Sequence, residues 1–144
     1  MTQPIEGAIA QIATVVGTVT GIRAAPNYPP DKMTYSPFAI TYLGTAHLDN
    51  GPIGTRRDIF SVMIDVLIPM RKLDNDLATL TPFHDLIQAA LQAQIRDNGG
   101  KFNNSIQAWD GGLTVSYLPK VDYAGLDCRG YRYEMLGIKI LVNT

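Results

Sequence analysis

The stretch Arg57-Asp-Ile-Phe-Ser-Val-Met-Ile-Asp-Val-Leu-Ile68 decides the fold of this chain. From Phe60 onwards every second side chain in it is apolar, namely Phe60, Val62, Ile64, Val66 and Ile68. Because successive side chains of a strand point to opposite faces, this period predicts a strand with one apolar face. The other face carries the mixed set Ile59, Ser61, Met63, Asp65 and Leu67, and Pro69 ends the strand. We therefore expect a sheet that is apolar on one side and half apolar on the other.

Further strands are expected on both sides of this one. Phe38, Ile40 and Tyr42 alternate with other residues and predict a strand that ends near Gly44. The Gly- and Pro-containing stretch from Thr45 to Thr55 predicts a long loop. Strands are also expected over residues 113–118, with a short continuation at 121–123, and over residues 131–142. In the last of these, one face is expected to hold Leu136, Ile138, Ile140 and Val142, and the opposite face Tyr131, Tyr133, Met135 and Leu141.

Two helical regions complete the pattern. The first is marked by apolar residues at helical spacing: Ile5, Ile9, Ile12, Val16 and Val19. The second runs over residues 73–98, where Thr81-Pro82 predicts either a kinked helix or a short helix followed by a longer one. Asn98-Gly99-Gly100 is a C-terminal stop. The order predicts one α+β domain over residues 1–144, a mostly antiparallel four- to five-stranded sheet with two helices packed on one face.

Composition excludes several classes of protein. The chain has 144 residues, a formal net charge of -1 and a single cysteine, Cys128. The near-neutral charge does not favour clamping of nucleic acid or of an anionic membrane, which need a concentrated positive field. One cysteine cannot form an intrachain disulfide. The apolar run from Gly7 to Ile22 is shorter than a membrane span and has no preceding basic residue, so neither a span nor a signal peptide is expected.

Residues able to do chemistry are few and scattered. His47 and His84 lack the spacing of a metal pair, and Cys128 has no neighbouring base in the sequence. The phosphate-binding and nucleophile motifs GxxxxGK, GxGxxG and GxSxG do not occur. We therefore expect no enzymatic activity, no metal and no cofactor.

Two sets of residues predict contacts with other proteins. The first set is the apolar residues expected on the sheet face away from the helices: Ile59, Met63, Leu67, Tyr131, Tyr133, Met135 and Leu141. A monomer rarely exposes so much apolar surface, so self-association is expected, unless the long loops fold back over this face. The second set is two basic pairs, Arg56-Arg57 and Arg71-Lys72, one at each end of the central strand. They are either solvated strand ends or candidates for ring docking or for a nucleic-acid-facing rim.

In its order of elements the chain resembles the tail-terminator, or tail-completion, proteins of long-tailed bacteriophages. The elements concerned are an apolar opening helix, then Asn27-Tyr-Pro-Pro-Asp31 leading into Ser36-Pro-Phe-Ala-Ile-Thr-Tyr42, and then the long strand Arg56 to Ile68. Leu73-Asp-Asn-Asp-Leu77 follows and runs into Thr81-Pro-Phe-His-Asp-Leu-Ile87, and the closing strand lies within residues 130–142. The resemblance covers nearly the whole chain as an order of elements, and no catalytic residue is carried over from the family.

The resemblance implies a virion protein, made in the host bacterial cytoplasm, that forms a homohexameric ring on the end of the tail tube. Its partners would be other copies of itself, the tail tube protein and the head-tail connector or stopper protein. DNA would pass through the lumen without specific binding. The segments from Thr45 to Thr55 and from Ile95 to Asp110 would dock neighbours.

Two alternatives stay open. The first is another phage neck component, a head-completion or connector protein, with the same composition and symmetry. The second is a small ligand-binding or catalytic α+β domain that uses Trp109, Tyr117 and Tyr123 around a pocket.

Overall fold

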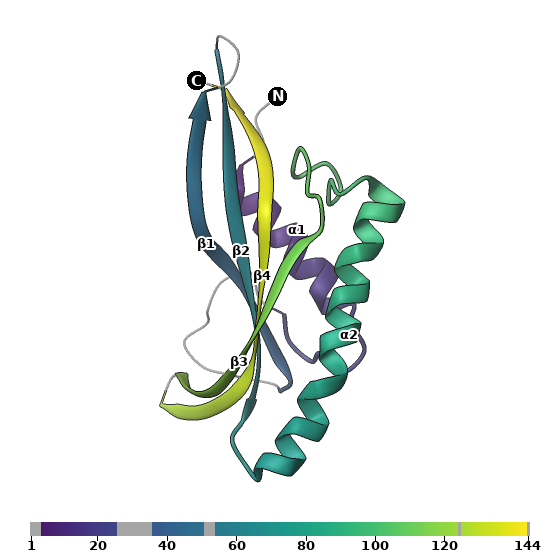
Figure 1. The fold of residues 1–144 in the computed structure, drawn as a ribbon, viewed down its shortest axis with the longest axis vertical. Coiled ribbons are helices and arrows are strands. Elements are labelled where there is room, and N and C mark those ends of the chain that lie inside the picture. The colour runs from purple at the N-terminus through teal and green to yellow at the C-terminus, as the bar shows by residue number, and fades with distance from the viewer. Residues whose placement is uncertain (1–3, 26–35, 51–53, 124, 144) are drawn as a thin grey trace.

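The computed structural model describes residues 4–25, 36–50, 54–123 and 125–143. The elements follow in the order α1 (Ile5–Gly17), β1 (Phe38–Asn50), β2 (Thr55–Pro69), α2 (Leu73–Asn98), β3 (Gly112–Tyr123) and β4 (Leu126–Asn143). The strands form one antiparallel sheet in the order β1-β2-β4-β3, and both helices pack on the same face of it (Figure 1). The predicted α+β fold is confirmed, and four strands are enough. The proline-rich connection over residues 26–35 lies outside the described residues.

The predicted central strand is confirmed as β2, which pairs with β1 on one side and β4 on the other. Its predicted apolar face is buried and points at the helices. The partners on α1 are Ala8, Ile9, Ile12 and Val16, and those on α2 are Leu80, Phe83, Ile87 and Leu91. The core therefore lies between one face of the sheet and the apolar stripes of two helices.

The second helical region is one continuous helix that passes through Pro82. Proline has no N–H group, so the carbonyl oxygen of Ala78 loses its usual partner four residues later. The helix nevertheless continues for four more turns, because Phe83, Ile87 and Leu91 keep its apolar stripe on the sheet. It ends as predicted at Gly99, which adopts the left-handed conformation with a φ of 62°.

The prediction of a loop from Thr45 to Thr55 is wrong for most of that range. β1 continues to Asn50 and β2 begins at Thr55, so the two strands form a long hairpin. The turn-like residue Gly44 lies in a bulge, where pairing shifts between Leu43 and Ala46. The Ser61 hydroxyl accepts the Thr45 N–H at 2.9 Å there. One bulge thus absorbs the irregular residue without ending the strand.

A second bulge corrects the predicted faces of the last strand. β2 residues Phe60 and Val62 pair with Ile138 and Met135, so two residues of β4 lie opposite the single residue Ser61. Gly137, in this bulge, has a φ of 72°. The extra residue reverses the alternation of side chains along β4. Tyr131, Tyr133 and Met135 therefore lie on the same face of the sheet as Ile138.

The segment after α2 closes the core on one side. The docking segment predicted from Ile95 to Asp110 begins within α2, and three of its residues, Phe102, Ile106 and Trp109, are buried in the core. The Trp109 indole N–H donates to the Gly112 carbonyl at 3.3 Å, and Ala108 bridges to Lys139 of β4. The three buried side chains of this segment therefore serve packing, and the docking of neighbours by its exposed residues stays a prediction.

One end of the sheet is rolled up on the face away from the helices. In a flat sheet the edge strands β1 and β3 would lie three strand spacings, or about 14 Å, apart. The rings of Phe38 on β1 and Tyr123 on β3 are only 5.5 Å apart. Between them Leu67 and Cys128 are buried in a second apolar cluster. Figure 1 shows the β3–β4 hairpin curling at this end of the molecule.

Gly130 makes the roll possible. It lies on β4 opposite Leu67 of β2 and Leu118 of β3. A Cβ atom at this position would collide with the carbonyl oxygen of Val66. The close approach of the two backbones therefore requires glycine here.

Candidate interaction surfaces

The three residues considered for catalysis lie apart. His47 is exposed on β1. It pairs with Ile59 of β2, which in turn pairs with Lys139 of β4. Cys128 lies at the other end of β4, on the order of 35 Å away along the strand. His84 is exposed on α2, on the opposite side of the sheet. The structure does not bring any two of them together.

Cys128 is also poorly placed to be a nucleophile. It is buried, and its thiol donates to the Leu126 carbonyl at 3.6 Å. Burial first, and then the nearby Asp127 and Asp122, raise the pKa of the thiol. A raised pKa disfavours the reactive thiolate.

The pocket residues of the ligand-binding alternative are divided as well. Trp109 is buried in the core beside the start of β3, and Tyr123, at the end of β3, packs in the rolled end of the sheet. Tyr117 lies between them on the helix side of β3, with its ring 5.6 Å from that of Tyr131. These aromatic residues do not surround a shared cavity.

The predicted apolar interface is largely internal. Tyr133 and Met135 are fully buried against the helices, because the β4 bulge places them on that side. Leu67 is buried within the rolled end of the sheet. The expectation that these three side chains lie exposed on the outer face is therefore wrong. Among the described residues, those of the curled strands bury Leu67.

The other four predicted interface residues are partly accessible. Tyr131 lies on the helix side, where it packs at the margin of the core. Ile59, Met63 and Leu141 lie on the outer face, and each is partly buried. Their role in a subunit interface stays a prediction.

A polar network crosses the middle of the outer face. The Tyr42 hydroxyl donates to Asp65 Oδ2 at 2.9 Å, and Arg132 donates to both carboxylate oxygens at 2.9 and 3.1 Å. Burial and then the Asp65 charge raise the pKa of Tyr42 to about 12. The hydrogen bonds to Asp65 raise the pKa of Arg132, so the guanidinium stays charged. The network links β1, β2 and β4 across this face.

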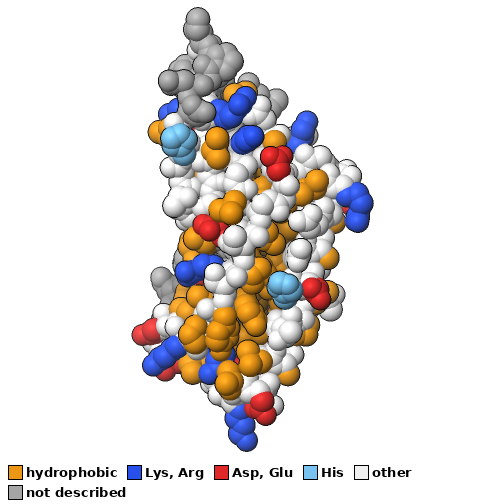
Figure 2. Space-filling view, viewed as in Figure 1, with side chains coloured by type: hydrophobic (Ala, Val, Ile, Leu, Met, Phe, Trp, Pro, Cys, Tyr) orange, Lys and Arg blue, Asp and Glu red, His pale blue; other side chains and the backbone are white. Residues whose placement is uncertain are grey.

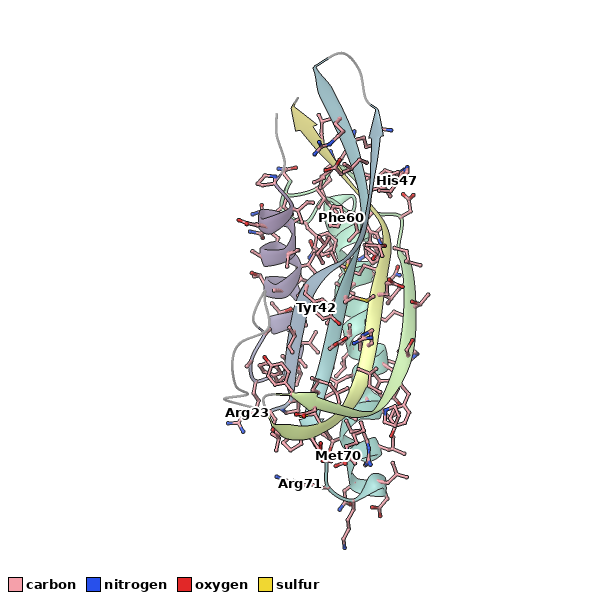
Figure 3. All side chains as sticks on the ribbon, turned by 90° about the vertical axis from the view of Figure 1, so that its left-hand side faces the viewer. Arg23, Tyr42, His47, Phe60, Met70 and Arg71 are labelled. Carbon is pink, nitrogen blue, oxygen red and sulfur yellow. The ribbon has the colours of Figure 1, made fainter. Side chains whose placement is uncertain are left out.

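The two basic pairs lie at opposite ends of the molecule, roughly 45 Å apart along β2. Figure 3 shows Arg71 at one end and His47 towards the other, with Tyr42 between them. Arg56 is bound to the buried Asp58 carboxylate at 2.8 Å, whereas Arg57, Arg71 and Lys72 are exposed. The four cations therefore cannot form one patch on a single chain.

The strand register places a further cation, Lys139, near Arg57 on the outer face. His47, Ile59 and Lys139 are cross-strand neighbours on the outer face, and Arg57, two residues before Ile59 on β2, lies on the same face. Nothing in the order of residues relates Lys139 to Arg57, because the β4 bulge and the strand order set their proximity.

An apolar surface lies on the helix side of β3. α2 packs over β2 and β4, which leaves Leu113 and Val115 partly exposed and the Tyr117 side chain 41% exposed. Leu86 of α2 is also exposed. Figure 2 shows hydrophobic side chains gathered over β3 and beside α2. This surface adjoins one edge of the sheet.

A second exposed apolar group adjoins the opposite edge. Leu43 and Leu48 lie on β1, and the Leu48 side chain is 58% exposed. Both sheet edges therefore carry apolar side chains that their own chain leaves in contact with solvent.

The described part of the chain offers neither a cluster of metal ligands nor a helix suited to span a membrane. No group of three or more His, Cys, Asp or Glu side chains there could hold a metal ion. None of the helices formed by these residues is long and apolar enough to cross a membrane. No protein-family model matches this chain, and no curated protein is significantly similar to it in sequence.

Proposed function

We propose that this chain is a structural, non-enzymatic subunit of a bacteriophage tail-terminator ring. The ring, a homohexamer, would sit at the head-proximal end of the tail tube and end its polymerisation. It would also offer the joining surface for the head-tail connector or stopper protein. The proposal places the protein in the virion and rests on the order of elements quoted above and on the surfaces of the sheet.

The observation that carries the proposal is a sheet with two accessible edges. Within the described residues, β3 pairs only with β4, and β1 pairs only with β2 apart from one bridge between Phe38 and Ala24. Each edge is bordered by exposed apolar side chains, Leu43 and Leu48 at β1 and Tyr117 at β3. Unpaired edges of this kind favour pairing with another chain.

The strand directions favour a head-to-tail contact. With four antiparallel strands, β1 and β3 run in opposite directions. The β3 edge of one copy can therefore pair antiparallel with the β1 edge of the next while all helices stay on one side. A contact between two different surfaces closes into a ring when the rotation between subunits allows it. The rolled end of the sheet leaves the other ends of β1 and β3 for this contact.

The charge of the chain is compatible with a passage for DNA. A net charge of -1 gives no strong attraction for phosphates, so DNA could move through a lumen without being held. Arg56, Arg57, Arg71 and Lys72 remain candidates for ring docking or for the rim of that lumen, and Lys139 joins them through its place beside Arg57.

Electron microscopy of the purified protein tests the proposal. We expect projection images with six-fold rings, and we expect phage particles made without this chain to have unattached tails of uncontrolled length. A monomeric protein at micromolar concentration, combined with normal particles in its absence, would refute both the ring and the role.

A binding experiment separates the proposal from the other neck components. A tail terminator should bind purified tails, whereas a head-completion protein should bind filled heads. For the catalytic alternative, the triple variant His47→Ala, His84→Ala, Cys128→Ser should retain full particle assembly. Loss of assembly with an intact fold would favour a chemical role for one of these residues.

A further inference from the structure

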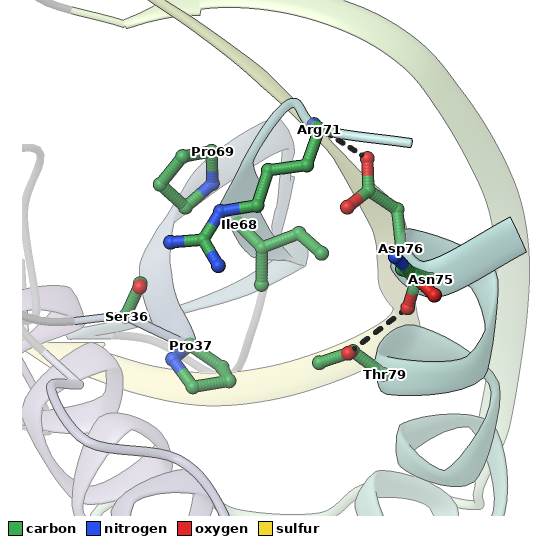
Figure 4. Close-up of a pocket in the computed structure, with 8 residues that line it drawn as sticks. All are labelled: Ser36, Pro37, Ile68, Pro69, Arg71, Asn75, Asp76 and Thr79. Atoms are coloured by element: carbon green, nitrogen blue, oxygen red, sulfur yellow. Dashed lines mark hydrogen bonds between the residues drawn. The ribbon is translucent and has the colours of Figure 1, made fainter. Parts of the chain in front are cut away.

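A small pocket lies where β1 begins, β2 ends and α2 begins. Its volume is about 180 Å³, and its walls include Ser36, Pro37, Ile68, Pro69, Arg71 and Asn75 (Figure 4). This volume accommodates about six non-hydrogen atoms, if each takes the roughly 30 Å³ of a liquid water molecule. The prolines and Ile68 form an apolar wall, and the remaining side chains are polar or charged.

The acidic residue of the pocket is already neutralised. Asp76 is buried, and its Oδ2 atom accepts the Arg129 Nη1–H at 2.7 Å and the Arg71 backbone N–H at 2.9 Å. Arg129 is also nearly buried, so the two form an internal ion pair with no net charge. Asp76 therefore neither repels an anion strongly nor needs a further cation.

Among the described residues, the Arg71 guanidinium is the one charged group lining the pocket that no ion pair neutralises. Figure 4 shows the Arg71 side chain extending over the pocket, away from Asp76 and towards Pro69 and Ser36. Its guanidinium makes no hydrogen bond or ion pair with the residues that the structure describes, whereas Arg56, Arg129 and Arg132 each bind a carboxylate. A guanidinium placed beside an apolar wall favours a planar anion with a short apolar chain.

We propose that this pocket binds a single carboxylate group carried on a short apolar chain. One cation and one internal ion pair give the pocket a net charge of +1, which matches a monoanion. A phosphate dianion fits less well, because the described residues that line the pocket offer no second cation for its second charge. Arg71 would donate two parallel N–H groups to the carboxylate, Ser36 and Asn75 would donate from the side, and the prolines would contact the apolar chain.

A carboxylate of this kind has two sources, a free small acid or a glutamate side chain of a docked protein. Both can be probed with ¹⁵N-labelled full-length chain by titration with butyrate and with N-acetyl-glutamate amide. The neutral N-acetyl-glutamine amide serves as the isostere. We expect saturable shifts at Ser36, Arg71 and Asn75, with dissociation constants on the order of millimolar and about tenfold weaker binding of the glutamine compound.

Two variants make the titration decisive. Arg71→Gln removes the guanidinium from an exposed position and should abolish the shifts without unfolding the protein. Arg57→Gln removes an equally exposed guanidinium at the far end of β2 and should leave them unchanged. Saturation by butyrate alone identifies a free acid, and saturation by the glutamate compound, with or without butyrate, identifies a protein side chain. Equal shifts with the glutamine compound, or shifts that persist in Arg71→Gln, would refute the pocket as a carboxylate site whether or not the protein forms rings.

Discussion

At the scale of single residues, the ion pair between Asp76 and Arg129 ties the start of α2 to the rolled end of the sheet. Both side chains are nearly buried, and the Arg129 Nε–H also donates to the Pro119 carbonyl at 3.4 Å. Removing one partner leaves the other charge buried without compensation. The pair thus specifies the geometry of this corner more than it adds net stability.

Asp76→Ala should therefore lower the free energy of unfolding by about 3–5 kcal/mol in urea denaturation. Arg96→Ala is the matched control, because the Arg96–Asp97 contact is exposed and should contribute less than about 1 kcal/mol. The double variant Asp76→Leu, Arg129→Met should be more stable than Asp76→Ala. Equal losses in Asp76→Ala and Arg96→Ala would show that the corner is solvated.

The raised pKa of Tyr42 should make the free energy of unfolding fall at alkaline pH. Its pKa is about 12 in the folded chain, above the value near 10 of an ordinary tyrosine. The folded state therefore holds the phenolic proton more tightly than the unfolded state does. The stability that this provides is fully present below pH 10 and is lost as the pH rises towards 12.

In Tyr42→Phe this alkaline loss should be smaller, and a late step in the tyrosinate absorbance titration should disappear. At pH 7 the variant should lose about 1–3 kcal/mol, because the hydroxyl donates to a charged acceptor. Tyr133→Phe is the control, since the Tyr133 hydroxyl is buried with no hydrogen-bond partner among the described residues. Its removal should be neutral or stabilising, and a loss as large as that of Tyr42→Phe would indicate a hidden partner.

At the scale of elements, the roll of the β3–β4 hairpin depends on one close contact between backbones. Gly130→Ala should destabilise the protein by about 1–3 kcal/mol, because the added methyl group meets the Val66 carbonyl. It should also expose the apolar cluster around Leu67, which fluorescence of a bound hydrophobic dye can report. Gly112→Ala, where the methyl group only touches Leu136, should change stability by less than about 0.5 kcal/mol. If both variants behave alike, the roll does not rest on Gly130.

The elements themselves follow largely from local patterns in the sequence. The period of two in residues 57–68 and the helical stripes around Ile12 and Ile87 survive in the structure because local preference and burial agree. The failures occur at bulges, where one added residue reverses the alternation of a strand. Gly137 within an otherwise alternating run is a signal for such a bulge, and reading it would have placed Tyr133 and Met135 in the core.

The interaction surfaces could be predicted only in outline. The basic pairs were visible as dipeptides, but the proximity of Arg57 to Lys139 depends on strand order and register. The pocket beside Arg71 brings Ser36 to Asn75 across 39 positions of the chain, which no local pattern encodes. The apolar excess predicted for the outer face was too large, because the β4 bulge turns Tyr133 and Met135 towards the helices and the rolled sheet buries Leu67.

At the scale of the whole molecule, the shape offers two different edges for association, and this predicts a distinctive pattern in mixed samples. Leu43→Lys places a charge on the β1 edge and Tyr117→Lys places one on the β3 edge, both at positions about 40% exposed. A lysine at an edge opposes pairing with another strand. Each variant alone should therefore be monomeric in light scattering, while Leu73→Lys, which lies on α2 away from both edges, should still form rings.

Mixing the two edge variants should give dimers and nothing larger. The β3 edge of the Leu43→Lys chain is intact, and so is the β1 edge of the Tyr117→Lys chain, so these two edges can pair. The two outer edges of the resulting dimer both carry a lysine, which prevents further addition. A contact of β1 with β1, or of β3 with β3, would instead let one variant dimerise by itself. Retained circular dichroism spectra and melting temperatures in both variants would show that the lost contacts are between chains. Rings in either variant alone would exclude the sheet edges as the subunit contact, because a closed ring needs both surfaces on every copy.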